Sequence, residues 1–192
     1  STVSKALMEA IVLVLVLLLL FLGDVRAALT VAITLPLAAL ATFLLMRQFG
    51  LSANLMSLGG LAIAIGMLVD GAVVVVENVV THLGRKDDPQ PRLHRIFRAV
   101  REVATPTSSG VLIIMIVFLP LLTLEGLEGK LFIPVALTIV FALGAALILS
   151  LTVVPVMSAY LLKEGAHGDP WLVRFALRLY TPMLDFVLGR AK

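Results

Sequence analysis

Five stretches of the chain are apolar over the roughly 20 residues that a helix needs to cross about 30 Å of hydrocarbon. They cover residues 6–22, 27–46, 54–80, 103–123 and 131–162. Backbone exposed to lipid must satisfy its hydrogen bonds within its own segment, so each stretch is predicted to be an α-helix. The pattern therefore predicts an all-α fold over residues 1–162, a polytopic integral membrane bundle of five transmembrane helices. Residues 163–192 are predicted to form a cytoplasmic linker.

Local signals sharpen the ends of these segments. The turn at residues 23–26 is so short that the first two helices must form an antiparallel hairpin. Ser52 is expected to be the N-cap of the third helix. Pro106 and Pro120 are expected to bend the fourth. The fifth segment is longer than a straight crossing requires, so it is expected to tilt, kink or protrude.

The linker contains a short amphipathic pattern over residues 171–180. Trp171 and Phe175 lie on one side of a helix with this sequence, and Arg174 and Arg178 lie on the other. Such a helix is predicted to lie on the membrane surface, with its apolar side in the headgroup region. A partly ordered soluble connector is the alternative.

The overall composition excludes a water-soluble domain. Hydrophobic residues make up 60% of the 192 positions and charged residues only 14%, and the mean hydropathy is +1.11. Cys is absent, which excludes thiolate ligands. His82, His94 and His167 are too far apart in sequence for the short ligand spacing of a metal centre, so no metal site is predicted.

Basic residues predict the topology. Twelve of the 15 Lys and Arg residues fall on one side of the predicted membrane, and residues 83–101, interpreted as a loop, hold six of them. Positive residues mark the cytoplasmic side, so the first helix is predicted to begin outside the cytoplasm. Lipid headgroups explain the net charge of +3, and no nucleic-acid partner is expected.

Asp70 is the outstanding polar residue, because it lies near the middle of the third apolar segment. An Asp at the centre of a spanning helix costs roughly 2.5 to 3.5 kcal/mol on insertion scales, so such residues usually serve a function. Glu77 follows seven residues later, on nearly the same face and about 10.5 Å along the axis. We interpret Asp70 and Glu77 as a proton relay. The alternatives are a neutral Asp70 that only bonds a neighbouring helix, and a Glu77 that anchors at the interface or bonds Asn78.

Small residues accompany the acid. Gly66 and Gly71 would let a neighbouring helix pack closely beside Asp70. A carboxyl alone in hydrocarbon stays neutral, so repeated protonation and release require a nearby cation or water. No Lys or Arg lies deep within the five segments, and a cationic partner is therefore expected from a helix outside this chain. The polar residues between Thr105 and Ser109 would either hydrate the proton path or bond the backbone freed by Pro106.

The segment Gly66-Met-Leu-Val-Asp-Gly-Ala-Val-Val-Val-Val-Glu-Asn78 resembles the fourth-helix signature of resistance-nodulation-division (RND) efflux permeases. Residues 117–132 and 149–156 resemble the fifth and sixth helices of that family. The chain is then expected to be a piece of a longer permease, from the second to the sixth helix of its N-terminal half. The resemblance implies a homotrimeric proton antiporter of the Gram-negative inner membrane, with a periplasmic adaptor and an outer-membrane channel. It also implies that Asp70 accepts the proton and pairs with a Lys from the second half.

Gly71 follows Asp70 where the drug-exporting branch usually has a second acid, so the chain looks more like the heavy-metal branch. Some metal exporters carry a further acid where this chain has Ala64. These residues favour part of a proton-driven heavy-metal exporter, with a multidrug exporter and a structural membrane subunit as alternatives. No enzymatic activity is expected, because an aspartyl protease needs a second intramembrane Asp, and no cofactor is expected beyond the coupling protons.

Overall fold

The computed structural model describes residues 23–85 and 89–163, with shorter stretches at residues 12–13, 16–17, 19–20, 173–175, 177–178, 180–182 and 184. These shorter stretches are helical. Most of the predicted first span and much of the predicted surface helix lie outside the described residues.

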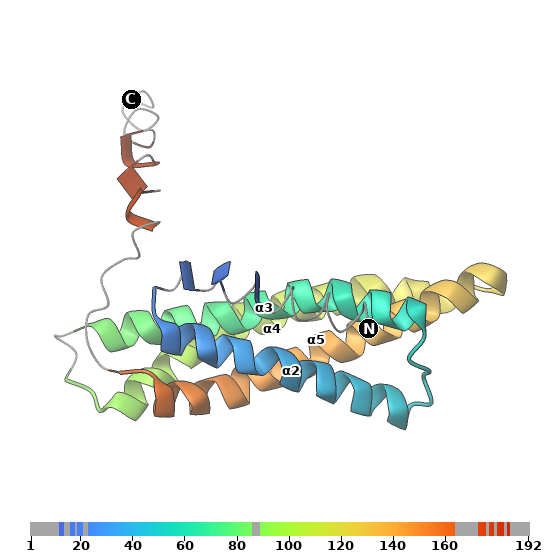
Figure 1. Cartoon of the computed structure of the whole chain (residues 1–192), viewed down its shortest axis with the longest axis horizontal. Coiled ribbons are helices and arrows are strands. Elements are labelled where there is room, and N and C mark those ends of the chain that lie inside the picture. Colours follow the sequence, from blue (N-terminus) through green and yellow to red (C-terminus); the bar gives the residue numbers. More distant parts are fainter. Residues whose placement is uncertain are drawn as a thin grey trace.

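Four long helices make up the described part of the chain (Figure 1). They are α2 (Val25–Gln48), α3 (Leu55–Gly84), α4 (Arg92–Phe118) and α5 (Gly126–Leu161), and a 3-10 helix, η1 (Leu119–Thr123), follows α4. Each of the four is long and apolar enough to cross a membrane, α4 together with η1. The predicted all-α membrane helix bundle is confirmed.

The predicted start of the fourth helix was wrong. α4 begins at Arg92 rather than at Val103, so most of the predicted loop over residues 83–101 is helical. Ile96 and Ala99 are buried in the first three turns of α4 and pack in one cluster with residues of α3. The apolar positions that build this extension are separated by charged ones, and hydropathy alone therefore does not detect it.

The N-cap of α3 is Asn54 and not Ser52 as expected. The Asn54 side chain accepts a hydrogen bond from the Ser57 backbone N–H at 2.9 Å, and the Ser57 hydroxyl accepts one from the Asn54 backbone N–H at 2.9 Å. This reciprocal pair satisfies two of the free N–H groups at the helix start. Ser52 instead supplies a backbone carbonyl that accepts from the Ser57 hydroxyl at 3.0 Å.

Prolines and length shape the last two helices. Pro106, Pro134 and Pro155 lie inside helices, whereas α4 gives way to η1 two residues before Pro120, which cannot donate a backbone hydrogen bond. The 36 residues of α5 extend for about 54 Å at the usual rise per residue. Figure 1 shows the junction of α4 and α5 projecting beyond the other helices, in keeping with the expected protrusion.

Two buried clusters hold the bundle together, and each contains four alanines. One lies toward the start of α2 and the end of α3 and includes Ala28, Ala72 and Ala99; the other includes Ala38, Ala64 and Ala142. Without a hydrophobic driving force between helices in lipid, close van der Waals packing of such residues stabilises association. α3 and α5 each pack against the other three long helices and against each other, so these two helices form the centre of the described bundle.

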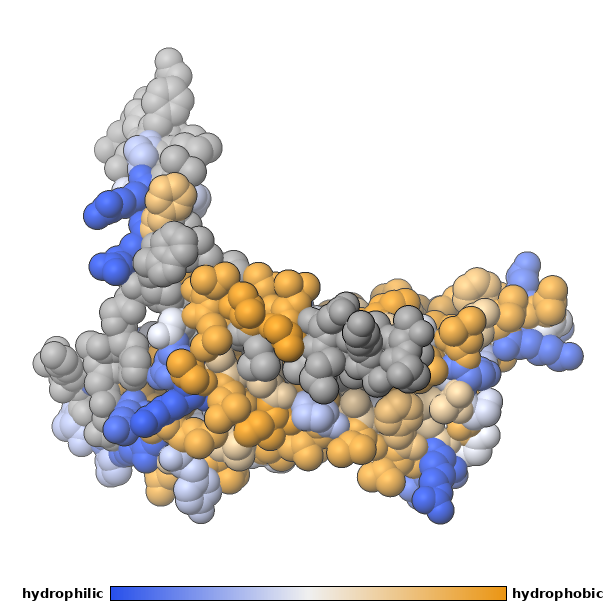
Figure 2. All heavy atoms as spheres, viewed as in Figure 1, coloured by the Kyte–Doolittle hydropathy of each residue, from blue (hydrophilic) through white to orange (hydrophobic). Residues whose placement is uncertain are grey.

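Four helix ends meet at one end of the bundle: the start of α2, the end of α3, the start of α4 and the end of α5. We call it the basic end, for its residues Arg26, Arg85, Arg92, Arg95, Arg98 and Arg101. Side chains there join the helices: the Arg26 guanidinium donates to the Leu161 carbonyl at 3.5 Å, and Arg92 donates to the Leu162 carbonyl. Figure 2 shows apolar residues over the middle of the visible face and polar residues toward both ends.

Candidate functional site

α3 has a buried side and an open side. Buried residues such as Ala64, Val75 and Val79 pack within the bundle. The opposite side carries exposed residues spaced three or four apart, as one face of a helix requires. We call this set the open face of α3: Gly59, Ile63, Gly66, Asp70, Val74 and Glu77.

Asp70 lies in the middle of the open face. Its side chain is exposed, and among the described residues it makes no hydrogen bond or ion pair. A carboxyl at the centre of a spanning helix that its own bundle leaves without a partner is costly. The geometry therefore indicates that groups outside the described chain face Asp70.

Glu77 lies on the same face, and α3 is continuous between the two acids, which keeps them about 10.5 Å apart along the axis. Glu77 makes no hydrogen bond within the described part of the chain. Its neighbour Asn78 is turned toward α4, where its amide donates to the Ala99 carbonyl at 2.7 Å and to Glu102 Oε2 at 3.4 Å. The structure therefore does not show the Glu77–Asn78 bond that was one alternative.

The two glycines near Asp70 have different surroundings. A Cβ built on Gly66 meets no atom within 4 Å, so this position on the open face has room for a neighbour. A Cβ on Gly71 would lie 3.7 Å from Thr107 Cγ2, an ordinary contact, so Gly71 faces α4. Ala64, where some metal exporters were expected to carry an acid, is fully buried and lies on the other side of α3.

The sequence did not single out Gly60, the glycine on which the packing of this helix depends most. A Cβ there would lie 2.8 Å from the Val135 carbonyl oxygen and 3.2 Å from its Cα. Backbone atoms cannot avoid such a contact by changing rotamer, as a side chain can. The helices α3 and α5 therefore approach this closely only because residue 60 has no side chain. Gly60 and Gly59 are adjacent in sequence, and only the structure shows which one meets a helix.

The polar residues of α4 lie next to α3. Thr107 is the residue that faces Gly71, one position after Asp70, while Thr105 and Ser109 are exposed. Within the described residues, the hydroxyls at positions 105, 107, 108 and 109 bond no carbonyl, in contrast to Thr30 and Thr42, which donate to carbonyls four residues earlier. The contact with α3 is consistent with the first interpretation, in which they lie beside the path of Asp70.

A second polar cluster, absent from the sequence predictions, joins α3 to α4 at the basic end. His82 is only 2% exposed, and its Nε2 lies 2.9 Å from Glu102 Oε2. Arg95, also buried, donates to the His82 carbonyl and to the Arg85 carbonyl, the latter at 2.7 Å. These bonds reach carbonyls at the end of α3, where the regular helical hydrogen bonds stop.

The sequence of this chain matches a known protein family. The model of the AcrB/AcrD/AcrF family matches residues 1–192, the whole chain. The chain belongs to the AcrB/AcrD/AcrF family. The predicted resemblance to RND efflux permeases is thereby confirmed.

Several relatives of this chain are named as metal-resistance proteins. The chain is 47% identical over 193 residues to the cobalt-zinc-cadmium resistance protein CzcA of Cupriavidus metallidurans, covering 96% of this chain and 18% of that protein. It is 39% identical to the nickel and cobalt resistance protein CnrA of the same species, covering 99% of this chain and 18% of that protein. The chain thus spans about a fifth of the length of these relatives.

A solved structure is similar to this chain in both fold and sequence. The crystal structure of a heavy metal efflux pump matches with a TM-score of 0.69 and 43% identity, over 82% of this chain and 15% of that one. At this identity both the fold and the sequence are shared. The predicted similarity to the heavy-metal branch of the family is confirmed.

Proposed function

We propose that this chain is part of the transmembrane domain of a proton-driven exporter of heavy-metal cations. Its relatives bear the names of metal-resistance proteins and of a heavy metal efflux pump. The observation that carries the proposal is the position of Asp70: exposed, at the centre of a long apolar helix, and without a partner among the described residues.

Asp70 is the proposed site of proton uptake and release. Moving one proton through 100 mV releases about 2.3 kcal/mol, which is comparable to the free energy needed to change the ionisation of a carboxyl between two surroundings. In one arrangement of the permease, a Lys from a helix of the second half lies beside Asp70 and favours the carboxylate. In another arrangement the Lys is more distant, and the carboxyl takes up a proton.

Glu77 is the proposed next group of the relay. It lies on the open face, two helical turns from Asp70 toward the basic end, so it can pass protons between Asp70 and the cytoplasm through water. Anchoring at the interface is the competing role, and the exposure of Glu77 favours neither role.

The rest of the exporter lies outside this chain. The proposed protein is a homotrimer in the bacterial inner membrane that works with a periplasmic adaptor and an outer-membrane channel. The site for the metal cation lies in other parts of the permease, so this segment supplies coupling rather than recognition. It performs no enzymatic reaction and uses no cofactor except the coupling protons.

Replacing Asp70 in the full-length permease tests the proposal. Asp70→Asn keeps the shape of the side chain but cannot ionise, so we expect metal resistance and metal efflux from everted vesicles to fall to the level of cells without the permease. The variant should reach the membrane in normal amount. Glu128→Gln, which removes an exposed carboxylate near the start of α5, is the matched control and should leave efflux unchanged.

Glu77→Gln, measured beside Asp70→Asn, separates the roles of Glu77. A relay predicts slower efflux at normal expression, because water can only partly replace the carboxylate, and an anchor predicts an unchanged rate. Full efflux by Asp70→Asn would instead support the structural membrane subunit and overturn the coupling proposal. Efflux of organic drugs but of no metal would support the multidrug alternative.

A further inference from the structure

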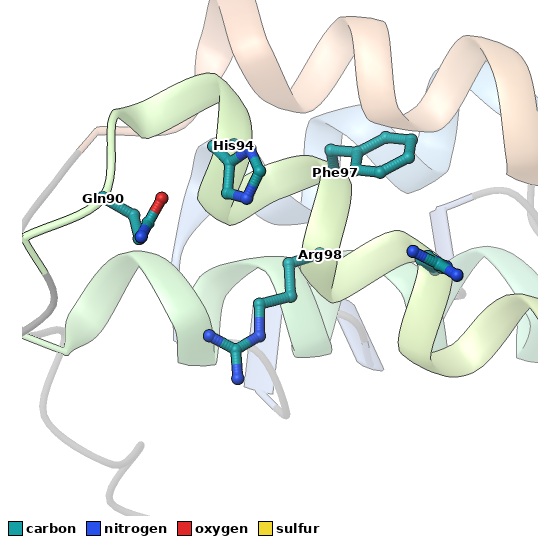
Figure 3. Close-up of a pocket in the computed structure, with 5 residues that line it drawn as sticks. Gln90, His94, Phe97 and Arg98 are labelled. Atoms are coloured by element: carbon teal, nitrogen blue, oxygen red, sulfur yellow. The ribbon is translucent and has the colours of Figure 1, made fainter.

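Two adjacent cavities lie at the basic end, beside the first turns of α4. One, of about 300 Å³, is lined by Gln90, His94, Phe97, Arg98 and Arg101, and Figure 3 shows its lining side chains around the start of α4. The other, of about 360 Å³, is lined by His82, Arg85, Arg98, Arg101 and Glu102, between the end of α3 and α4. Because Arg98 and Arg101 line both, we treat the two as one basic pocket.

The arginines of this region fall into two groups. Arg92 and Arg95 are bonded to backbone carbonyls at the ends of α5 and α3, so their guanidinium groups already have partners. Arg85, Arg98 and Arg101 are exposed, and their guanidinium groups make no hydrogen bond or ion pair in the part of the chain that the structure describes. The bundle is therefore joined by one group, while the other group lines the basic pocket.

The carboxylate in the basic pocket is already engaged. Glu102 Oε2 lies 2.9 Å from His82 Nε2 and 3.4 Å from the Asn78 amide. Its single charge opposes three guanidinium groups, so the described pocket carries excess positive charge. Arginine presents several donors in a planar fork that fits phosphate, which makes this group of residues suited to a phosphate anion.

His82 adds an independent observation. The residue lines the basic pocket and is 2% exposed, yet its Nδ1 is buried without a hydrogen-bond partner among the described residues. Buried ring nitrogens are normally satisfied. His82 thus adds to the lining of the basic pocket a side chain with one ring nitrogen that the described bundle leaves unsatisfied.

The depth of the pocket selects a lipid. The apolar part of α4 starts at Val103. Arg101 lies two residues before it, about 3 Å along the helix axis, and Arg98 lies five residues before it, about 7.5 Å along the axis. That depth is where phospholipid headgroups lie. On the membrane side of both arginines, Leu112 and Ile116 of α4 are 50% and 61% exposed, which gives acyl chains an apolar surface that continues inward from the charges.

We propose that the basic pocket binds the headgroup of an anionic phospholipid of the phosphatidylglycerol class. Arg98 and Arg101 hold the phosphate, Arg85 adds positive charge, and the acyl chains extend into the membrane along α4 toward Leu112 and Ile116. Basic pockets between transmembrane helices on the cytoplasmic side are suited to such lipids. The proposal does not rest on which substrate the permease transports.

Native mass spectrometry of the full-length permease in neutral detergent tests this site. The protein is titrated with phosphatidylglycerol, with zwitterionic phosphatidylethanolamine and with inorganic phosphate. We expect phosphatidylglycerol to bind most tightly. The double variant Arg98→Gln/Arg101→Gln should bind it about 30-fold more weakly, from roughly fivefold for each basic residue near an anionic headgroup.

Two further variants make the result decisive. Arg47→Gln removes an exposed arginine at the other end of α2 and should leave the affinity for phosphatidylglycerol unchanged. Arg98→Lys/Arg101→Lys keeps both charges and should retain affinity within about fivefold, which excludes misfolding as the cause of the loss. Three results would overturn the proposal. They are equal affinities of the wild type and the double Gln variant for phosphatidylglycerol, a loss of affinity in Arg47→Gln as large as that in the double Gln variant, and displacement of the lipid by millimolar inorganic phosphate.

Discussion

The open face of α3 and the basic end of the bundle both contain charged residues, but the two regions differ in whether these residues have partners within the described chain. At the basic end, His82, Arg92 and Arg95 have partners in neighbouring helices. On the open face, Asp70 and Glu77 have none among the described residues. A polar group that its own bundle satisfies stabilises the packing of that bundle, whereas one left open at membrane depth depends on a partner from elsewhere. The contrast separates structural charges from candidate functional ones.

The most severe test of this comparison is a substitution on the open face that leaves the described bundle untouched. A side chain at Gly66 meets nothing within 4 Å in this chain, but in the full permease we expect a helix to cover it. Gly66→Leu should therefore reduce metal efflux more than tenfold and destabilise the full-length protein by about 1 to 3 kcal/mol, as overpacking does.

Gly110→Leu is the control for this experiment. Gly110 also has open space around its Cβ position, but it lies on α4 and is not part of the open face of α3. Efflux assays and unfolding measurements should show little change in this variant. An equally small effect of Gly66→Leu would mean that lipid rather than a helix covers the open face.

A smaller effect is expected at the basic end. Arg95→Gln removes a buried guanidinium that bonds two carbonyls at the end of α3, and the loss should lower the free energy of unfolding by about 1 to 3 kcal/mol. Arg98→Gln removes an exposed arginine without a described partner, so in neutral detergent its effect should stay within about 0.5 kcal/mol. Equal losses, measured by denaturant or thermal unfolding, would contradict the division into two groups of arginines.

The sequence predicted the features that depend on single segments. Apolar runs located the four described spans, and the isolated Asp70 was recognised because a carboxyl among some 20 apolar residues is rare. Its exposure on an open face agrees with the expected partner outside the chain. The first turns of α4 escaped prediction, since arginines at every third position hide the buried Ile96 and Ala99.

Features that depend on how helices cross were not predictable from the sequence. His82 and Glu102 are twenty residues apart, and they meet only because α3 and α4 pack at one particular rotation. Gly60 and Gly66 look alike in sequence, yet one contacts the backbone of α5 and the other faces open space. Nothing local distinguishes Asn54 from Ser52 as the N-cap, and the choice follows from the reach of Asn54 to Ser57.

The central claim is that Asp70 changes its protonation during transport. Infrared difference spectroscopy of the full-length permease in a lipid bilayer, comparing metal-free and metal-loaded protein, follows the C=O stretching band of a protonated carboxyl directly. We predict a difference band that is present in the wild type, retained in Glu128→Gln and absent in Asp70→Asn. A spectrum in which Asp70 keeps one ionisation state with and without metal, while the wild-type protein transports, would contradict the account.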